Sequence, residues 1–302
     1  MLSLTREYGI DVNVNMQGLG DSMLHIIHEF RKDRLAILGT AVLFLLMLIA
    51  ALAPYIAPFD PVELNLAERL LSPSARHLMG TDSVGRDLLS RVIYGTRVSL
   101  MIAIVVVIIE VLFGVLVGTA AGYLGRTVDE VLMRLVDILM AFPSIILALV
   151  IVGMLGTAIM NLIIALTSVG WVRYARVVRG SILSVKKETF IESARAIGCG
   201  KLRIAFRHIL PNIISPVIVL ATLNMGTIII SIAGLSFLGL GVQPPTPEWG
   251  IMLSEGKPFM ESAPHLMIFP GLMIMVTVLA FNFLGDGLRD VLDARIKETV
   301  EY

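Results

Sequence analysis

An uncharged run of 21 residues, Leu35–Tyr55, constrains the fold of this chain more than any other feature. A helix needs roughly 20 apolar residues to cross the hydrocarbon core of a bilayer. Hydrocarbon offers no partner for backbone polar groups, so a segment of this kind must be helical if it crosses a membrane. We therefore interpret residues 35–56 as a first transmembrane helix.

The composition extends this interpretation to the whole chain. Of 302 residues, 56% are hydrophobic and 16% are charged. Soluble proteins carry roughly 25% charged residues. We predict an all-α polytopic membrane protein. One cysteine, Cys199, excludes an internal disulfide, and five scattered histidines form no metal-ligand set, so no metal or other cofactor is expected on this chain.

Five further segments are long and apolar enough to span. They run from Val98 to about 121, from 132 to 155, from Ala158 into a basic stretch, within 213–238, and near 266–283. Pro143 should kink the third of the six predicted spans, because proline lacks a backbone donor. The resulting prediction is six transmembrane helices.

The basic residues predict the orientation. With the amino terminus inside, 18 Lys and Arg residues fall on the cytoplasmic side and 6 outside, as the positive-inside rule favours. Both termini are then cytoplasmic. The expected regions are a tail with a short surface helix (1–34), the first span (35–56), an external loop (57–97), a five-helix core (98–285) and a cytoplasmic tail (286–302).

The charged stretch Glu188–Asn212 lies between two apolar segments. Thr189 and Glu192 have the spacing of a helix capping box. Gly198 should end this first short helix, since glycine tolerates positive φ. A second short helix is expected at Lys201–Ile209, with Leu202, Ala205, Phe206 and Ile209 on one side, before Pro211 opens the fifth span. From the residues alone, an amphipathic hairpin resting on lipid headgroups explains the stretch equally well.

The same stretch resembles the EAA loop of ABC-importer permeases, E-A-A-x3-G-x9-I-x-L-P. The matching positions are Glu192-Ser193-Ala194, Gly198 and Leu210-Pro211. Ser193 replaces an alanine, and His208 replaces the isoleucine of the general pattern. A histidine at this place is usual in the peptide and nickel branch.

Four other stretches resemble that branch, in the same order along the chain. They are Gly80–Arg91 with Tyr94–Arg97, Met133–Asp137 with Ala141–Pro143, Pro244–Gly250, and Phe281–Asp290. The resemblance covers about residues 30–296, with alanine at 294 where proline is common. The chain is similar to C-type permease subunits of dipeptide, oligopeptide or nickel importers.

This resemblance implies a permease that couples to cytosolic ATPases through its EAA loop. The implied coupling residues are Glu192, Ser193, Ala194, Arg195, Gly198, Arg203, Leu210 and Pro211. The implied partners are a second homologous permease, two ATP-binding subunits and an extracytoplasmic substrate-binding protein, in a prokaryotic cytoplasmic membrane. Peptide is the expected substrate, with nickel as the alternative. No nucleic acid is expected.

Polar residues inside the predicted spans are candidates for a translocation path, because burying them in hydrocarbon is costly. The candidates are Glu110, Asn161, Asn224, Thr227 and Ser231. Glu110 either faces a path or pairs within the bundle. The other four residues more commonly form interhelical hydrogen bonds. Arg134 and Asp137 are expected to pair with each other along one helix.

The external loop is either a solvated connection or a scoop-like segment that helps to receive a binding protein. Asp82, Arg86, Asp87 and Arg91 have spacings that predict ion pairs in a short helix.

Single features of the sequence fit two other classes of function. Gly234-Leu235-Ser236 resembles the nucleophile motif of rhomboid-type intramembrane serine proteases, but the only downstream histidine, His265, lies at a loop edge. A proton-coupled secondary transporter would need more mid-membrane ionisable groups than Glu110. The chain has no G-x-x-x-x-G-K-[ST] motif, so we expect it not to be an enzyme and ATP to be hydrolysed by partner subunits.

Overall fold

The computed structural model describes residues 30–300, with side-chain environments given outside 201–202 and 293–300. Nearly all of the predicted surface helix at 23–30 lies outside this range. The long helices are α2 (Arg34–Ile56), α3 (Leu88–Leu124), α4 (Arg126–Met140), α5 (Ser144–Leu155), α6 (Ile159–Val185), α9 (Leu210–Phe237) and α11 (His265–Val300). The shorter ones are α7 (Thr189–Ala196), α8 (Lys201–Ile204) and α10 (Trp249–Gly256), with single turns at Leu66–Glu68, Ala205–Ile209 and Lys257–Phe259.

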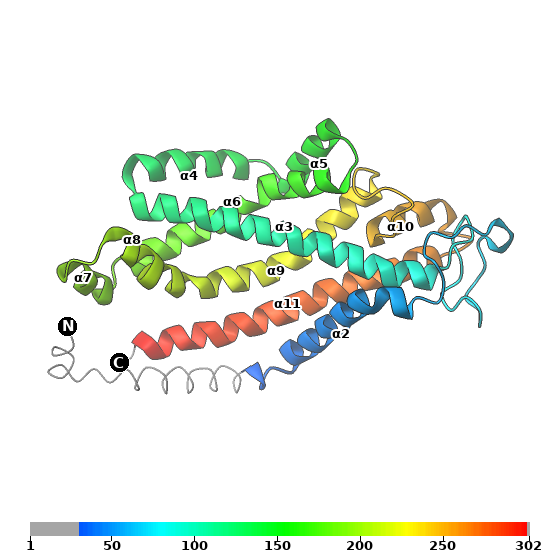
Figure 1. Ribbon diagram of the computed structural model, residues 1–302, viewed down its shortest axis with the longest axis horizontal. Coiled ribbons are helices and arrows are strands. Elements are labelled where there is room, and N and C mark those ends of the chain that lie inside the picture. Colours follow the sequence, from blue (N-terminus) through cyan, green and yellow to red (C-terminus); the bar gives the residue numbers. More distant parts are fainter. Residues whose placement is uncertain (1–29, 301–302) are drawn as a thin grey trace.

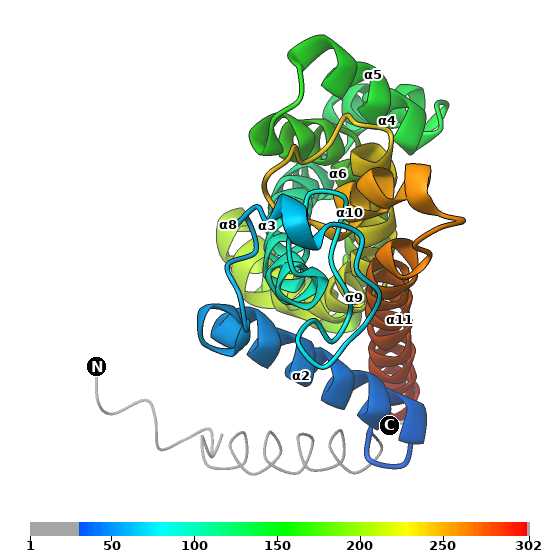
Figure 2. The ribbon, with the colours of Figure 1, turned by 90° about the vertical axis from the view of Figure 1, so that its right-hand side faces the viewer.

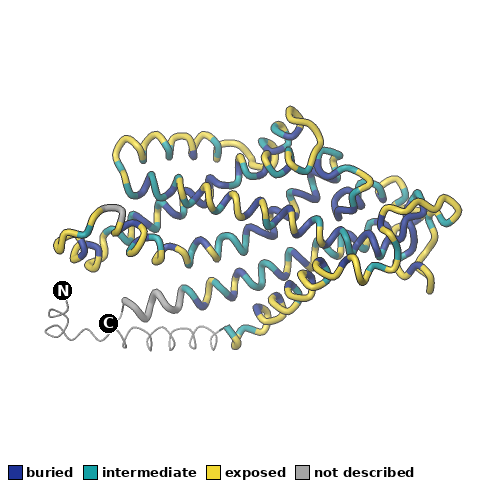
Figure 3. The backbone as a smooth tube through the Cα atoms, in the orientation of Figure 1, coloured by how far each residue is buried: buried dark blue, intermediate teal, exposed yellow. Residues whose placement is uncertain are grey.

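The long helices lie side by side along the longest axis of the molecule (Figure 1). The short helices α7 and α8 lie at one end, and the 57–87 connection and α10 lie at the other. Viewed along the bundle, α4 and α5 are on one side of α3, α6 and α9, while α2 and α11 are on the opposite side (Figure 2). Exposed residues line the outer sides of α2 and α4, and buried ones gather between the helices (Figure 3).

Within residues 30–300, four helices are long and apolar enough to cross a membrane: α2, α3, residues 205–237 and residues 265–292 of α11. The bent pair α4–α5 passes the same test when taken as one span, which raises the number to five. The remaining predicted span corresponds to α6, which has 27 residues and carries three arginines in its second half.

The helices extend beyond two of the predicted segments, and the bend predicted at Pro143 is present. Helix α3 begins at Leu88, ten residues before the predicted second span, because the Asp87 carboxylate caps it by accepting from the Ser90 amide (2.8 Å). The predicted kink at Pro143 is a break, with α4 and α5 inclined by 86°. The predicted carboxy-terminal tail continues α11 as helix to Val300.

Helices α3 and α6 pack so closely that residues larger than glycine would not fit on the facing side of α3. Gly114, Gly118 and Gly122 recur every fourth residue on the face of α3 toward α6. A Cβ atom on Gly118 would lie 2.6 Å from the Ala175 carbonyl oxygen and 2.7 Å from the Val178 Cβ atom. Small residues at this spacing let two helix backbones approach inside a membrane.

We predict that Gly118→Ala destabilises the purified protein by roughly 1–3 kcal/mol, the usual cost of overpacking. The change should lower the midpoint of thermal unfolding measured in detergent. Gly180→Ala on α6 is the matched control, since a Cβ atom there meets nothing within 4 Å. Equal midpoints for the two variants would contradict the close α3–α6 contact.

Candidate functional site

The stretch 188–212 forms a compact unit held against the end of the bundle. Ile191 and Ala194 of α7 are buried, at 0% and 5% exposure. They pack in one cluster with Tyr174, Val178 and Ile182 of α6. The opposite face of α7 exposes Glu192, Ser193 and Arg195. The packed face therefore fixes the direction in which the polar face points.

Gly198 ends α7 as predicted. Its φ is +82°, and the turn is closed by hydrogen bonds from the Gly198 amide to the Arg195 carbonyl and from the Cys199 amide to the Ala194 carbonyl, each 3.0 Å. A Cβ atom at 198 would meet nothing within 4 Å. Backbone conformation, and not space, is what requires glycine here. The single cysteine follows in a half-buried position.

The predicted capping box is wrong. The helix begins one residue earlier than the motif requires, with Glu188 as its N-cap and Thr189 as its first helical residue, and no side chain caps it. The amide of Glu192 donates to the Glu188 carbonyl at 3.3 Å.

Between α8 and α9 the chain makes a π turn, Ala205–Ile209, and continues into α9 at Leu210 without a break. Ala205 and Ile209 are buried, but Phe206 is 67% exposed, which corrects the prediction that all three share one side. The wider turn changes the angular spacing between successive side chains. Leu210 is half-buried and Pro211 is exposed at the start of α9.

Large apolar side chains remain exposed on this end of the molecule. Phe190 is 42% exposed, Ile197 81% and Phe206 67%. Exposed Glu192, Ser193, Arg195, Gly198 and Arg203 lie on the same unit. We call this surface, formed by all eight residues, the α7–α8 surface. Exposed apolar groups among charges are typical of a protein contact site.

A cavity of about 350 Å³ lies between α3, α6, α9 and the α4–α5 break. It brings together four of the five predicted path residues, which are Glu110, Asn224, Thr227 and Ser231. Arg173 of α6, which is exposed, also lines it. Asn161 lies elsewhere: its side-chain amide donates to the Leu155 carbonyl (2.8 Å) and the Gly156 carbonyl (3.0 Å).

Glu110 both lines this cavity and pairs within the bundle. It is 2% exposed and accepts a hydrogen bond from the Asn224 amide (2.8 Å). The same amide lies 3.1 Å from the Tyr174 hydroxyl. Gly170 leaves space for the carboxylate, because a Cβ atom there would collide with it. Helices α3, α6 and α9 thus meet at one polar cluster.

Gly170, Arg173 and Tyr174 of this cluster were not predicted from the sequence. Their only signal was the presence of a carboxylate in a span, which requires a polar partner and space on neighbouring helices. The sequence alone did not indicate which helices would be neighbours.

Other ionic contacts connect α4 to α6. Asp137 pairs with Arg176 of α6, not with Arg134 on its own helix as predicted. Arg179 binds both carboxylate oxygens of Asp129, at 2.8 Å and 2.6 Å. A bidentate pair of this kind fixes the relative orientation of the two side chains better than a single hydrogen bond does.

At the opposite end of the bundle, buried charges join the 57–87 connection to α3 and α10. Asp82 pairs with Arg86 (2.6 Å) and with Arg91 of α3, and both arginines bind Glu255 of α10, at 2.9 Å and 2.6 Å. Burial raises the pKa of Asp82, but Arg91 and Arg86 more than offset this, so its pKa lies below the usual value. The predicted ion pairs form, but residues 81–87 are not helical, so the predicted short helix was wrong.

Family models match this chain along much of its length. Residues 114–298 match the model of the binding-protein-dependent transport system inner membrane component. Residues 23–73 match the N-terminal TM domain of oligopeptide transport permease C. The chain belongs to the family of binding-protein-dependent transport permeases.

The sequences of two curated relatives align with nearly the whole permease. The dipeptide transport system permease protein DppC of Alkalihalophilus pseudofirmus is 46% identical over 269 residues, which are 89% of this chain and 88% of the relative. The glutathione transport system permease protein GsiD of Escherichia coli is 48% identical over 270 residues, 89% of each chain.

Solved structures share the fold of this permease. A chain of the inward-facing MetNI methionine ABC transporter superposes with a TM-score of 0.55 at 19% identity, covering 68% of the permease and 97% of that chain. A second crystal form gives a TM-score of 0.56 at 22% identity, with 68% and 96% covered.

We predict that Asn224→Ala destabilises the permease, because it leaves the buried Glu110 carboxylate without its donor. Such a loss costs roughly 1–3 kcal/mol, and more for a charged group. Thermal unfolding of the purified protein measures it. Thr227→Ala, on an exposed residue of the same helix one turn later, should leave the midpoint unchanged. Similar losses in both variants would refute the pairing.

Proposed function

We propose that this permease forms half of the translocation path of an ABC importer for peptides. The observation that carries the proposal is its near full-length similarity to a dipeptide permease and a glutathione permease. Both substrates named by these relatives are peptides, which favours peptide over nickel.

The proposed topology has six spans: α2, α3, the α4–α5 pair, α6, α9 and α11. Helix α6 becomes a span if its arginines lie toward the cytoplasmic headgroups, where Asp129 and Asp137 are its partners. The α7–α8 surface and the end of α11 lie at one end of the bundle (Figure 1), which supports a cytoplasmic location for the stretch 188–212 and for the carboxy terminus. The first 34 residues would also be cytoplasmic, and the 57–87 connection external.

The α7–α8 surface is proposed to dock into a cytosolic ATPase. Phe190, Ile197 and Phe206 would supply apolar contacts, and Glu192, Ser193, Arg195 and Arg203 polar ones at the rim. In this proposal Ala194 acts indirectly, because it is buried against the bundle. Leu210 and Pro211 join the surface to α9, so that movement of the ATPase would be passed along that helix.

The cavity beside Glu110 is proposed as part of the path that this permease shares with a second, homologous one. Glu110, Arg173, Asn224, Thr227 and Ser231 give it polar groups at membrane depth. Asn161 is omitted from the path because its amide is committed to backbone carbonyls. An external binding protein would deliver the substrate, and two ATPase subunits would supply the energy.

The geometry gives less support to the two other classes of function, an intramembrane serine protease and a proton-coupled secondary transporter. The Ser236 hydroxyl accepts from the Val242 amide (3.2 Å) and bonds to Glu248, whereas His265 lies against Gly80. Within the described residues, therefore, Ser236 is not paired with the histidine base that a serine protease needs. Glu110 is paired with Asn224 inside the bundle, which does not favour a proton carrier.

We expect gentle purification of this permease from its native membrane to recover a second permease and ATP-binding subunits. Reconstituted into vesicles with ATP inside and the cognate binding protein outside, the complex should accumulate labelled dipeptide. A chain recovered alone or as a homomer, without ATPase subunits, would reject the importer assignment.

We further expect Gly198→Ala to reduce coupling while leaving assembly intact. An alanine at φ +82° costs roughly 1–2 kcal/mol, which would distort the turn after α7. Gly200→Ala is the control, since that glycine has no positive φ and open space around it. ATPase activity per transported peptide should rise in the first variant only. Unchanged coupling in both would exclude the turn as a coupling element.

A further inference from the structure

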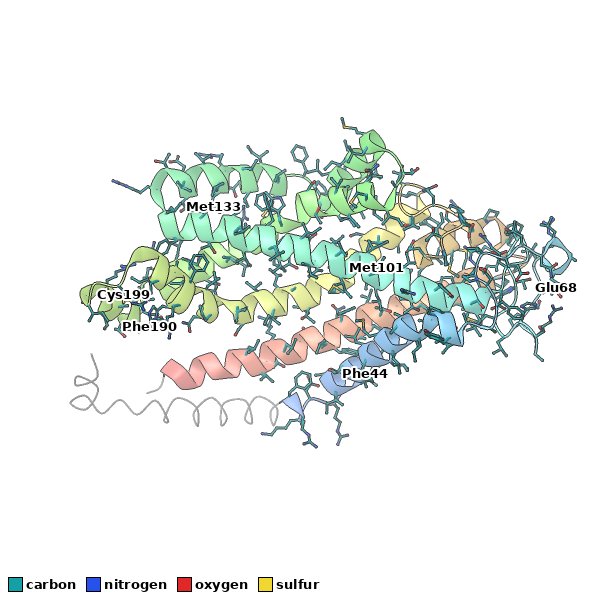
Figure 4. All side chains as sticks on the ribbon, viewed as in Figure 1. Phe44, Glu68, Met101, Met133, Phe190 and Cys199 are labelled. Carbon is teal, nitrogen blue, oxygen red and sulfur yellow. The ribbon has the colours of Figure 1, made fainter. Side chains whose placement is uncertain are left out.

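A small acidic cavity lies in the 57–87 connection, at the end of the bundle opposite the α7–α8 surface. Its volume is about 200 Å³. In Figure 4, Glu68 of its wall is at one extremity, while Phe190 and Cys199 are at the other. The lining residues are Phe59, Asp60, Glu63, Asn65, Glu68, Arg76, His77, Gly85 and Asp87.

His77 forms the inner wall of this cavity. The side chain is 4% exposed, stacks on Phe59 with ring centroids 4.8 Å apart, and places Nδ1 2.8 Å from Asp87 Oδ1. An ionised carboxylate can only accept, so Nδ1 of the ring carries the proton. In the neutral imidazole, Nε2 is therefore an acceptor.

This acceptor is buried and makes no hydrogen bond within the described part of the chain. Glu68 Oε2 lies 3.4 Å from it. In the neutral ring these two atoms are both acceptors, and Nε2 has no donor among the described residues. Buried polar atoms are rarely left in this state, because an unpaired one is costly. The arrangement is suited to an N–H donor that enters from the cavity.

The charge of the cavity also favours a cation. Glu68 already binds Arg76 and accepts from the Asn65 amide (2.8 Å), and Asp87 is committed to His77 and to the cap of α3. Asp60 and Glu63 are exposed at the rim. The lining holds four carboxylates and one arginine, so a negative excess remains.

We propose that this cavity receives one lysine or arginine side chain of the external substrate-binding protein. The proposal rests on the proposed importer function. The side chain would donate to His77 Nε2 and Glu68 and would pair with Asp60 and Glu63. At about 200 Å³, the cavity is smaller than the usual small-molecule pocket of roughly 300–1,000 Å³. The described residues contain no group of three or more ligands placed to hold a metal ion.

Docking here would act on the first turn of α3. Asp87, which contacts His77, accepts hydrogen bonds from the Ser90 amide (2.8 Å) and hydroxyl (2.7 Å). The Ser90 hydroxyl in turn accepts from the Phe59 amide at 3.0 Å. Helix α3 carries Glu110 further along. The cavity is therefore connected to the helix that lines the proposed path.

The test uses the complete complex, with both permeases and the ATPases, in nanodiscs. ATPase activity is measured against the concentration of the cognate binding protein. The double variant Asp60→Asn, Glu63→Gln should raise the half-saturating concentration about tenfold and leave the maximal rate unchanged, as expected when charged contacts at an interface are lost. Asparagine at 60 can still accept from the Val62 amide, as Asp60 does (2.9 Å), so the local turn is kept.

Glu261→Gln is the matched control, because Glu261 is an exposed carboxylate in the connection before α11 and outside the cavity. A half-saturating concentration that is unchanged in the double variant, or raised equally in the control, would overturn the proposal. The same holds if added Ca²⁺ or Mg²⁺ shifts the wild-type value but not that of the double variant, since the occupant would then be an inorganic cation. A wild-type complex that no binding protein stimulates would reject the importer function itself.

A photo-crosslinking residue at position 63 gives a second readout that does not depend on activity. Its adduct with the binding protein should map to a peptide containing an exposed lysine or arginine. An adduct on an acidic or apolar surface would contradict the proposal even if the affinity had changed.

Discussion

The close contact between α3 and α6 is the interaction on which the rest of the bundle depends. Lipid surrounds the helices with material as apolar as their own side chains, so helix association relies on close packing and buried polar contacts. The glycine series of α3 supplies the packing. The Glu110–Asn224–Tyr174 cluster supplies the polar contact and adds α9 to the pair. Because α6 also carries the arginines that hold α4, most of the core is positioned through it.

Tyr174 belongs to two parts of the molecule at once. Its ring is in the apolar cluster that seats α7, and its hydroxyl is in the polar cluster beside the cavity. The α7–α8 surface and the cavity are therefore parts of one packed unit. A displacement of α7 can reach the cavity through direct contacts, with no flexible segment between them. Helix α3 extends the same unit toward the opposite end, where Asp87 caps it.

The sequence predicted the helical class, the approximate positions of the long helices and the turn at Gly198, because apolar run length and the φ preference of glycine are local properties. Prediction from the sequence failed where the position or partner of a residue depends on tertiary contacts. The partner of Asp137 is Arg176 and not Arg134, because a neighbouring helix competes with the i,i+3 position. The start of α3 was not predicted because its first ten residues include Arg91, whose charge is neutralised by Glu255, 164 positions further along the chain. Gly170 could be assigned a role only after the helix opposite it was known.

The single cysteine of this permease is a natural site for attaching a spectroscopic label. Cys199 is the only thiol in the 302 residues and directly follows the turn that ends α7. A spin label or fluorophore attached there requires no background substitution. In a complex whose other subunits lack reactive thiols, its mobility and environment would follow this one turn through the transport cycle. The half-buried position of the thiol makes such a signal sensitive to small changes in how α7 is seated.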